Sequence, residues 1–403
     1  MSLKTTRRKL LAAGAGTALA PSALAARQKI LYEDSIYQKL LGVRPILTCR
    51  GHTTAFGGSL MPPEVLRAMQ EANDVFIDML ELQAAAGKRI ARIMKTESAM
   101  VSAGSFSAML LGCAACLTGK DPAKIDALPH PAWPKREVVI QKAHRNGYDH
   151  AFRMVGLKLV EAETADEVRH AINDKTAGLA MVLSHNSIGH KVELDEMIDI
   201  AHRARLPLIL DAAAEVPPPE NLSKFVRMGA DLVAFSGGKN IRGPQCSGIL
   251  MGRKDLIEAA YVNSSPNNHF ARIAKVGKEE IVGLLVAVEL CLKKDHAAER
   301  REWTAMLERI ATRLRGIPSV KSEFIPNLDY SHSPRLSVQW DEAKLGITLD
   351  QMVKRLRSGE PAIEASDMTK FRPAWKGLGI FPYNLKPGEE IIIADRVKQI
   401  LRT

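Results

Sequence analysis

The 403-residue sequence has few cysteines, no long apolar run and no internal repeat or low-complexity tract. No apolar stretch reaches the roughly 18 residues that a membrane span requires, so we expect none in the mature chain. The five cysteines are an odd number, which argues against a disulfide framework. Only Cys113 and Cys116 are close to each other in the sequence. They could form a redox or metal-binding pair, but we favour the alternative that they are two small residues of a packed helix. No second pair completes a zinc site, so no metal is expected.

The sequence also lacks a cluster of basic residues. Its formal net charge is +11, and four of the positive charges lie in residues 1–26, which contain no acid. Removal of this segment leaves +7, spread along the chain. This distribution is weak evidence for nucleic acid, and we expect no such partner. An anionic small substrate or a solvated basic surface explains the charge equally well.

The first 26 residues have the order of regions found in a signal peptide. Arg7 and Arg8 precede a mildly apolar run at residues 10–20, and the small residues Ala23-Leu24-Ala25-Ala26 follow Pro21. The arginine pair resembles a twin-arginine (Tat) export signal, although a basic disordered tail is the alternative. We therefore expect residues 1–26 to be a Tat-type signal peptide and the mature protein to be periplasmic or secreted.

Strands and helices alternate from about residue 62 to residue 255, which predicts an α/β fold with a mostly parallel sheet covered by helices. A long helical segment at 278–315 leads to a smaller C-terminal α/β domain, and the Pro-rich stretch 120–136 is expected to be a surface loop. We divide the chain into an N-terminal segment packing on the small domain (27–61), a large domain (62–290), a linking helix (291–315) and the small domain (316–403). The expected strands are 99–102, 138–140, 157–160, 179–183, 206–210 and 232–235, and the expected helices are 62–73, 84–94, 106–117, 164–173, 194–204, 348–357 and 391–401.

Two of the predicted strands end in a polar residue that carries chemistry. Asp211 ends the strand 206–210, and Lys239 follows the strand 232–235 through Ser236-Gly237-Gly238. Ligands bind at the carboxyl ends of parallel strands, so both side chains are expected in one cleft. A lysine and an aspartate suit pyridoxal 5′-phosphate (PLP): the amine forms a Schiff base with the aldehyde, and the carboxylate holds the pyridine nitrogen protonated. Taken singly, Asp211 suits a helix N-cap and Lys239 a solvated loop.

The cofactor phosphate has candidate ligands elsewhere in the sequence. Gly104 and Ser105 lie between a strand and a helix, where free amides and the helix dipole favour an anion. Ser236, three residues before Lys239, is placed to bond a phosphate oxygen. Ala213 is small enough to lie beneath a flat ring.

Further candidates follow other strands. His144 follows the strand 138–140 and suits either stacking on a pyridine ring or an exposed loop. His185 and Asn186 follow the strand 179–183 and are expected to face the cleft, where they would bind substrate. Arg335 and Arg372 are candidates for a substrate carboxylate, without a motif that selects either.

With these residues assembled, residues 32–403 resemble the fold-type-I PLP-dependent enzymes, in particular the selenocysteine synthase (seryl-tRNA selenium transferase) group and its D-glucosaminate-6-phosphate ammonia-lyase relatives. The most specific part is 231–252, with Asp-Leu-Val-Ala-Phe-Ser-Gly-Gly-Lys, Gly-Pro-Gln and Gly-Ile-Leu-Met-Gly. The resemblance implies that Lys239 is the Schiff-base lysine, Asp211 the partner of the pyridine nitrogen and His144 the stacking residue. It also implies a homodimer or higher homo-oligomer.

Selenocysteine synthases differ at two points: they have an arginine where His144 aligns, and they typically carry an N-terminal tRNA-binding region. An exported protein would not meet aminoacyl-tRNA, so selenium transfer is not expected. We expect a PLP-dependent lyase that acts on a small amino acid or amino sugar acid by α,β-elimination, with Lys239 taking the α-proton. An aminotransferase or racemase is the alternative, and a non-catalytic PLP-fold binding protein is less favoured because Lys239 and Asp211 are both present.

Overall fold

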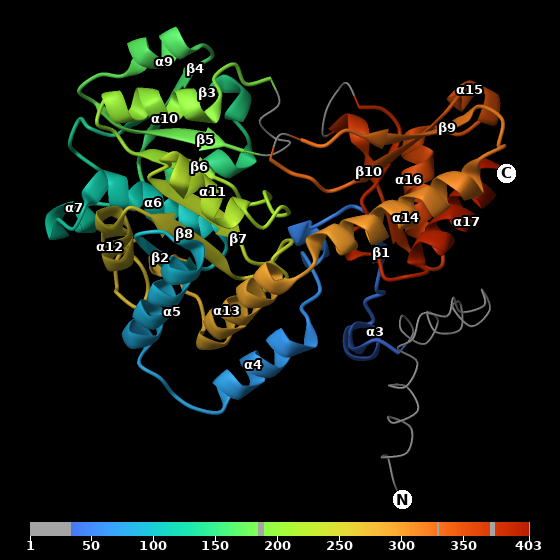
Figure 1. Cartoon of the computed structure of the whole chain (residues 1–403), viewed down its shortest axis with the longest axis horizontal. Coiled ribbons are helices and arrows are strands. Elements are labelled where there is room, and N and C mark those ends of the chain that lie inside the picture. The colour runs from blue at the N-terminus through green and yellow to red at the C-terminus, as the bar shows by residue number, and fades with distance from the viewer. Residues whose placement is uncertain (1–33, 184–188, 329, 371–374, 403) are drawn as a thin grey trace, which may run out of the picture.

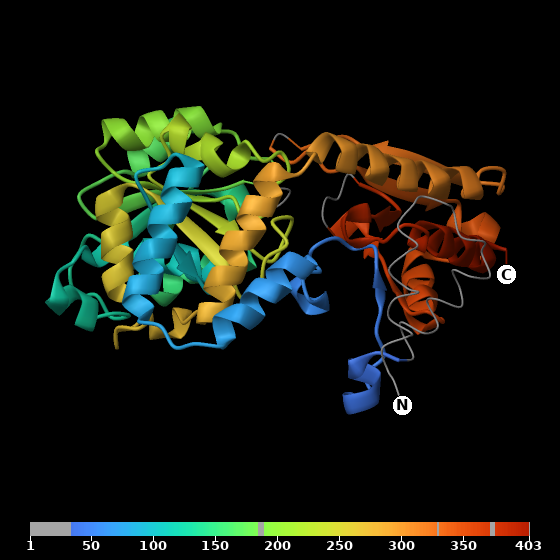
Figure 2. The ribbon, with the colours of Figure 1, turned by 60° about the horizontal axis from the view of Figure 1, so that its bottom comes forward.

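The computed structural model describes residues 34–183, 189–328, 330–370 and 375–402. Figure 1 shows these residues forming two domains, with blue to yellow segments in the larger and mostly orange to red segments in the smaller. In Figure 2, α13 (Lys278–Lys293) lies in the larger domain and α14 (His296–Leu314), which follows it, lies in the smaller. The boundary between the domains therefore falls between these two helices.

A seven-stranded sheet forms the centre of the larger domain, in the order β2-β8-β7-β6-β5-β3-β4. Only β8 is antiparallel to its neighbours in this sheet, β2 and β7, and every other adjacent pair is parallel. The expected α/β fold with a mostly parallel sheet is thus confirmed. The strands are β2 (Ser98–Ser102), β3 (Glu137–Gln141), β4 (Lys158–Ala162), β5 (Thr176–Val182), β6 (Leu208–Asp211), β7 (Leu232–Ser236) and β8 (Gly248–Gly252).

Helices cover both faces of this sheet because neighbouring side chains along each strand point to opposite faces. In β3, Val139 packs in a core with residues of α5, α10, α11 and α13, whereas Val138 and Ile140 pack with α6, α8 and α12. The helices of this domain are α4 (Pro63–Asn73), α5 (Met79–Met94), α6 (Ser105–Thr118), α7 (Pro122–Asp126), α8 (His150–Met154), α9 (Ala165–Ala171), α10 (Leu194–Arg203), α11 (Asn221–Met228), α12 (Lys254–Asn263) and α13.

The two close cysteines lie in α6, most of whose residues are buried. Both are free thiols, and burial raises the pKa of Cys116 to about 12 and that of Cys113 well above its usual range. A thiol that stays protonated is a poor nucleophile and a poor metal ligand. Packing within a helix therefore accounts for this pair.

The smaller domain contains a four-stranded antiparallel sheet in the order β12-β13-β10-β9. A short strand from the N-terminal segment, β1 (Leu47–Thr48), pairs in parallel with β11 (Ile363–Glu364) of this domain. The other elements are α3 (Ile36–Leu41), which precedes β1, and β9 (Val320–Ile325), β10 (Arg335–Trp340), α15 (Glu342–Leu345), α16 (Leu349–Ser358), β12 (Ser366–Asp367), β13 (Leu378–Ile380) and α17 (Glu389–Leu401).

The structure differs from the sequence-based expectations in three places. The stretch 120–136 contains the short helix α7, whose amides Asp121 caps, and β8 is a strand that we did not expect. The segment 278–315 forms two helices rather than one, because the Asp295 carboxylate accepts a hydrogen bond from the Ala298 amide at 2.8 Å and begins α14. Trp303 and Leu307 of α14 belong to the core of the smaller domain, so residues 296–314 are part of that domain rather than a linker.

Candidate active site

The predicted polar residues meet at the carboxyl ends of the central strands. Asp211 is the last residue of β6, and Ser236 is the last residue of β7. Strands β6 and β7 are parallel neighbours, and Asp211 lies opposite Ala234. A cavity of about 300 Å³ opens at this edge of the sheet. Its lining includes all seven residues that we expected to bind the cofactor, namely Gly104, Ser105, His144, Asp211, Ala213, Ser236 and Lys239.

Lys239 lies at the start of a tight turn after β7. The Arg242 amide donates to the Lys239 carbonyl at 2.9 Å, and the Gly243 amide donates to the Gly237 carbonyl at 2.8 Å. A Cβ on Gly237 would lie 2.1 Å from the Ser247 hydroxyl, and one on Gly238 would lie 2.5 Å from the Gln245 Cα. The glycines before Lys239 are therefore required by close packing against the returning chain.

Asp211 is partly buried, and its Oδ1 accepts a hydrogen bond from the Ala213 amide at 3.0 Å. Burial raises the pKa of Asp211, and the Ala213 amide and the charge of Lys239 oppose this shift. The pKa of Lys239 is lowered by burial, while Asp211 and Glu215 oppose that change. Each charge is thus costly in this place and is stabilised by an opposite charge nearby.

His144 follows β3 and is fully buried, which excludes the exposed loop position. Its Nδ1 accepts a hydrogen bond from the Val182 amide at 3.4 Å, which assigns the proton of the neutral ring to Nε2. Burial, with a smaller effect of His190, lowers the pKa of His144 to about 3. The ring is therefore a flat, uncharged wall of the cavity at neutral pH.

The turn before α6 provides an anion site. Gly104 is the N-cap residue with φ of +93°, and no side chain caps the first amides of α6. A Cβ on Gly248 would lie 2.4 Å from the Gly104 carbonyl carbon, so β8 holds this turn closely. Unpaired amides at the start of a 14-residue helix would suit a phosphate group.

The remaining predicted residues do not line this cavity among the described residues. Arg335 is buried in β10 of the smaller domain, where its Nη2 donates to the Ser331 hydroxyl at 3.3 Å. Its Nη1 is buried without a hydrogen-bond partner in the described part of the chain. His185, Asn186 and Arg372 lie outside the described residues.

A loop from the N-terminal segment closes over the turn of Lys239, and we did not predict this contact. The Ser59 hydroxyl donates to the Gly238 carbonyl at 3.0 Å, and Gln245 Nε2 donates to the Thr54 carbonyl at 3.1 Å. In the same loop, the ring of His52 stacks on that of Tyr383, with centroids 5.5 Å apart. The sequence offered one signal, the glycine-rich stretch 51–58, but nothing in it pointed to the partner segments.

His52 is the second histidine near the lysine whose ring stays neutral. Burial, with the charges of Arg242 and Lys239, lowers the pKa of His52 to about 3. Its Nε2 is buried without a hydrogen-bond partner among the described residues. His52 therefore adds an uncharged hydrogen-bonding group close to Lys239.

The groups around the cavity fit PLP, because they match each part of that molecule. Lys239 would supply an amine for the aldehyde, Asp211 a carboxylate for the pyridine nitrogen, and His144 with Ala213 two flat or small surfaces for the ring. The turn at Gly104, with Ser236, would supply donors for the phosphate. No group of three or more His, Cys, Asp and Glu side chains in the described ranges could hold a metal ion, and no helix there could cross a membrane.

This fold, with a lysine and an aspartate at adjoining strand ends, defines a fold-type-I PLP-dependent enzyme. The class-V aminotransferase family matches residues 138–272. A 5′-C-glycyluridine monooxygenase-decarboxylase of Streptomyces sp is 31% identical, over 90% of this chain and 91% of its own length. A D-glucosaminate-6-phosphate ammonia lyase of Salmonella typhimurium is 29% identical, over 91% of this chain and 98% of its own. The chain therefore belongs to the fold-type-I family of PLP-dependent enzymes that includes these two relatives.

Solved structures agree with this assignment. A D-glucosaminate-6-phosphate ammonia-lyase superposes with a TM-score of 0.79 at 28% identity, covering 91% of this chain and 98% of its own. A serine palmitoyltransferase of Sphingomonas wittichii, with a TM-score of 0.59 at 14% identity, shares the fold alone. An L-seryl-tRNA(Sec) selenium transferase of Mannheimia succiniciproducens is 28% identical but matches over only 45% of this chain and 42% of its own length.

Proposed function

We propose that this PLP-dependent enzyme is a lyase that eliminates a β-substituent from a small amino acid or amino sugar acid. The observation that carries the proposal is the pairing of the Lys239 amine with the Asp211 carboxylate in one cavity, on a chain that matches an ammonia lyase over nearly its full length. Water completes the balance: the amino acid with its leaving group and one water give a keto acid, ammonia and the protonated leaving group.

Each residue of the cavity has a separate role in the proposed reaction. PLP, when bound, supplies an electron-withdrawing ring that stabilises negative charge at the α-carbon. Lys239, whose pKa is lowered by burial, is suited to take the α-proton as a neutral amine. Asp211 would keep the pyridine nitrogen charged, and His144 and Ala213 would hold the ring between them.

Arg335 is the better-supported anchor for the substrate carboxylate. Arg335 is 6% exposed, and its Nη1 is buried without a hydrogen-bond partner among the described residues. Arg335 also lies at the Tyr383 hydroxyl, whose pKa it lowers against the effect of burial. A buried cation without a counter-ion is costly, and an anionic substrate group would remove that cost.

The test uses purified holoenzyme incubated with a panel of amino acids and amino sugar acids, D-glucosaminate 6-phosphate included. We expect ammonia and a keto acid without an added amino acceptor, and no product from Lys239→Ala. A strict requirement for a keto-acid acceptor would reject elimination and identify an aminotransferase. Inversion of the α-carbon without ammonia would identify a racemase. Absence of a visible cofactor band in protein incubated with PLP would reject the enzyme assignment.

The Streptomyces relative supports a second candidate, oxidative removal of the substrate carboxylate. That relative is named a monooxygenase-decarboxylase, and its match covers 90% of this chain, against 91% for the ammonia lyase. Such a reaction consumes O₂ and releases CO₂, whereas elimination does neither. Measurement of dissolved O₂ and of CO₂ in the same incubations separates the two.

Export and assembly are also proposed here. Residues 1–26 are proposed as a Tat-type signal peptide, because Arg7 and Arg8 precede an apolar run and small residues. We expect the mature chain in the periplasm to begin near Ala26 or Arg27 by mass spectrometry. Replacement of Arg7 and Arg8 by lysine should retain the protein in the cytoplasm, and unchanged export would reject the pathway.

We further propose that the mature chain assembles as a homodimer.

A further inference from the structure

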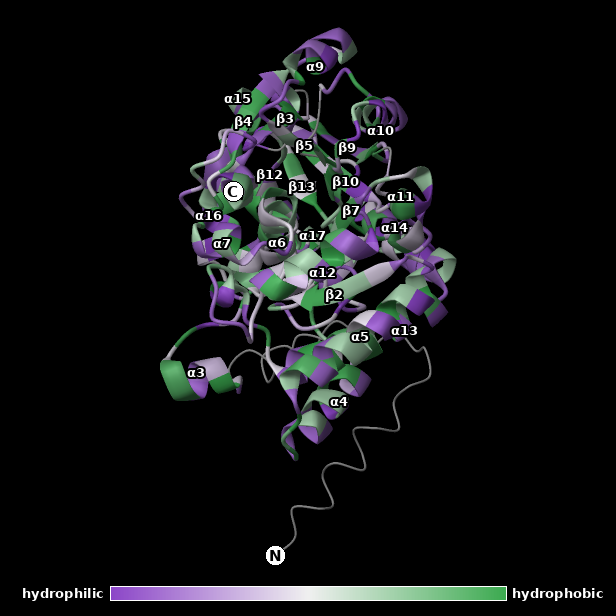
Figure 3. Cartoon of the chain, turned by 90° about the vertical axis from the view of Figure 1, so that its left-hand side faces the viewer, coloured by the Kyte–Doolittle hydropathy of each residue, from purple (hydrophilic) through white to green (hydrophobic). Residues whose placement is uncertain are grey.

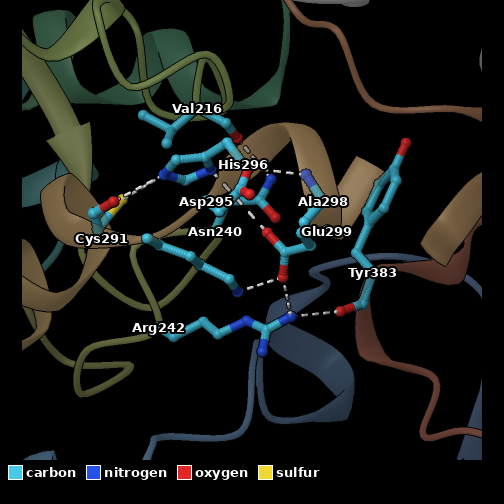
Figure 4. A network of polar contacts seen from close by, with 10 residues as sticks. Val216, Asn240, Arg242, Cys291, Asp295, His296, Ala298, Glu299 and Tyr383 are labelled. Carbon is cyan, nitrogen blue, oxygen red and sulfur yellow. Dashed lines mark hydrogen bonds and ion pairs between the residues drawn. The ribbon is translucent and has the colours of Figure 1, made fainter. Parts of the chain in front are cut away.

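Arg242 connects the turn of Lys239 with the smaller domain (Figure 4). Its amide donates to the Lys239 carbonyl at 2.9 Å, so the two residues belong to one turn. Its Nη2 reaches across to the Tyr383 carbonyl and to Glu299 Oε1, each at 3.1 Å. The position of the lysine is thus linked to that of the smaller domain through one side chain.

Glu299 is the acidic group at the centre of these contacts. It lies in the first turn of α14, and its side chain is 11% exposed. Its carboxylate pairs with Arg242 and with Lys294, and His296 Nδ1 lies 3.9 Å from Oε2. Because α14 packs in the core of the smaller domain, Glu299 brings a fixed negative charge to the domain boundary.

The backbone at Arg242 is held in an unfavourable conformation. Its φ is +59°, in the left-handed region that residues other than glycine rarely adopt. Such a conformation is costly and persists where the surroundings fix it. Here both sides of the turn are fixed, since Asn240 Nδ2 donates to the Val216 carbonyl at 2.5 Å and Arg242 is held by Glu299.

We propose that Glu299 is a positioning residue that acts through Arg242 to hold the turn of Lys239 against the smaller domain. Tyr383, whose carbonyl Arg242 binds, contacts His52 through its ring and Arg335 through its hydroxyl. The lysine is therefore held at a set place relative to the part of the smaller domain that contains Arg335. This role goes beyond the proposed reaction, because it applies whichever bond of the substrate is broken.

The test measures how firmly Lys239 is held, without a substrate. Hydroxylamine forms an oxime with the PLP aldehyde carbon and releases the free lysine amine, and loss of the visible band gives the rate. We expect Glu299→Gln holoenzyme to react about tenfold faster than wild type, since a loosened turn no longer holds the amine in place. Glu302→Gln, an exposed residue further along α14, is the matched control and should react at the wild-type rate.

The pH dependence of the visible band gives a second measure that a purely structural role would not change. Loss of the Glu299 charge leaves the positive charge of Arg242 uncompensated. The pH at which the visible band is half changed should therefore move to a lower value. Among the described residues, the charged or titratable groups that face Glu299 are Arg242, Lys294, His296 and Cys291. Those around Lys239 are Asp211, Glu215, His52 and Arg242. A midpoint and rate equal to those of wild type would overturn the proposal.

A double variant separates action through Arg242 from other effects. Arg242→Gln alone should react as fast as Glu299→Gln, and the pair together no faster than Arg242→Gln. If Glu299→Gln accelerates the reaction equally in the Arg242→Gln background, Glu299 does not act through Arg242 and the proposal is wrong. Glu299→Asp keeps the charge and shortens the side chain. If Glu299→Gln does not fold, Glu299→Asp replaces it in the hydroxylamine test, where we expect the same faster reaction, whereas its pH midpoint should stay at the wild-type value.

Discussion

Burial moves the ionisable side chains around the cavity toward their neutral forms. It lowers the pKa of Lys239 and raises that of Asp211, and it lowers the pKa of both His144 and His52 to about 3. A lysine that loses its proton more readily is a better nucleophile and base at neutral pH. Of these groups, the two histidines carry no charge in the pH range where proteins usually work.

His144 provides a test of this effect through stability. Its pKa is 6.5 when exposed and about 3 when folded, so below pH 6.5 the unfolded chain binds a proton that the folded chain does not. Stability from this group is therefore present above pH 6.5 and is lost toward pH 3, by up to about 1.4 kcal/mol per pH unit.

Replacement of His144 by phenylalanine removes this titration and keeps a flat ring. We expect the melting temperature of His144→Phe to fall less than that of wild type between pH 7 and pH 5, measured by circular dichroism. His52 still titrates in the variant, so part of the acid sensitivity remains. Equal losses of melting temperature in the two proteins would show that His144 is not buried in its neutral form.

Single residues were predictable from the sequence where they follow a strand. Asp211 and Lys239 stand at strand ends, and parallel strands bring their carboxyl ends together, so their meeting followed from the pattern. His52, Arg242 and Tyr383 come from three segments with no shared pattern, and their contacts depend on how the two domains pack. A single sequence contains no periodic signal for such a contact.

At the scale of elements, the start of α6 is the feature of the proposed cofactor site that best suits a phosphate group. The helix packs against the sheet and is mostly buried from Ala108 onward, while the residues at its start line the cavity, so its free amides and dipole act there. Gly104 has φ of +93°, and Gly119 at the other end of the same helix has φ of +55°. A Cβ at either glycine would meet no atom within 4 Å, so neither position is restricted by packing. The two glycines differ in that Gly104 lines the cavity and Gly119 lies at the far end of the helix.

Alanine at these glycines should separate cofactor binding from stability. Both Gly104→Ala and Gly119→Ala force an unfavourable φ, so each should lower the free energy of unfolding by about 1 kcal/mol. Only Gly104→Ala should weaken PLP binding, by about tenfold or more, because it shifts the amides that face the phosphate. Absorbance titration with PLP measures this, and equal affinities for the two variants would place the phosphate elsewhere.

Elements with a regular pattern were predictable, and those set by tertiary contacts were not. Strand β7 covers Leu232–Ser236, one residue longer than the expected strand at 232–235. The break between α13 and α14 depends on the cap at Asp295, a short polar signal inside a helix-favouring sequence. Strand β8 lies between two glycines and returns antiparallel beside β7, a pairing that the alternating strand–helix pattern does not predict.

At the scale of the whole molecule, one side of the chain exposes an unusual number of large apolar residues. Between α4 and α5, Phe76 is fully exposed, Val75 is 64% exposed and Ile77 is 49% exposed. Four apolar residues of α3 are exposed as well, and Figures 1 and 3 show α3 standing apart from both domains. Such surfaces usually mark a contact with another chain, and we propose that the other chain is a second copy of the protein.

Replacement of Phe76 by aspartate should weaken this proposed dimer. Burial of a phenylalanine contributes about 1.5–3 kcal/mol, and a charge in its place adds a desolvation cost, so affinity should fall about a hundredfold or more. We expect light scattering after gel filtration to give twice the chain mass for wild type and the single mass for Phe76→Asp at low micromolar concentration. Phe324→Asp, at an exposed apolar position on β9 of the smaller domain, is the control and should remain a dimer. A monomeric wild type would reject the dimer, and a dimeric Phe76→Asp would place the interface on another face.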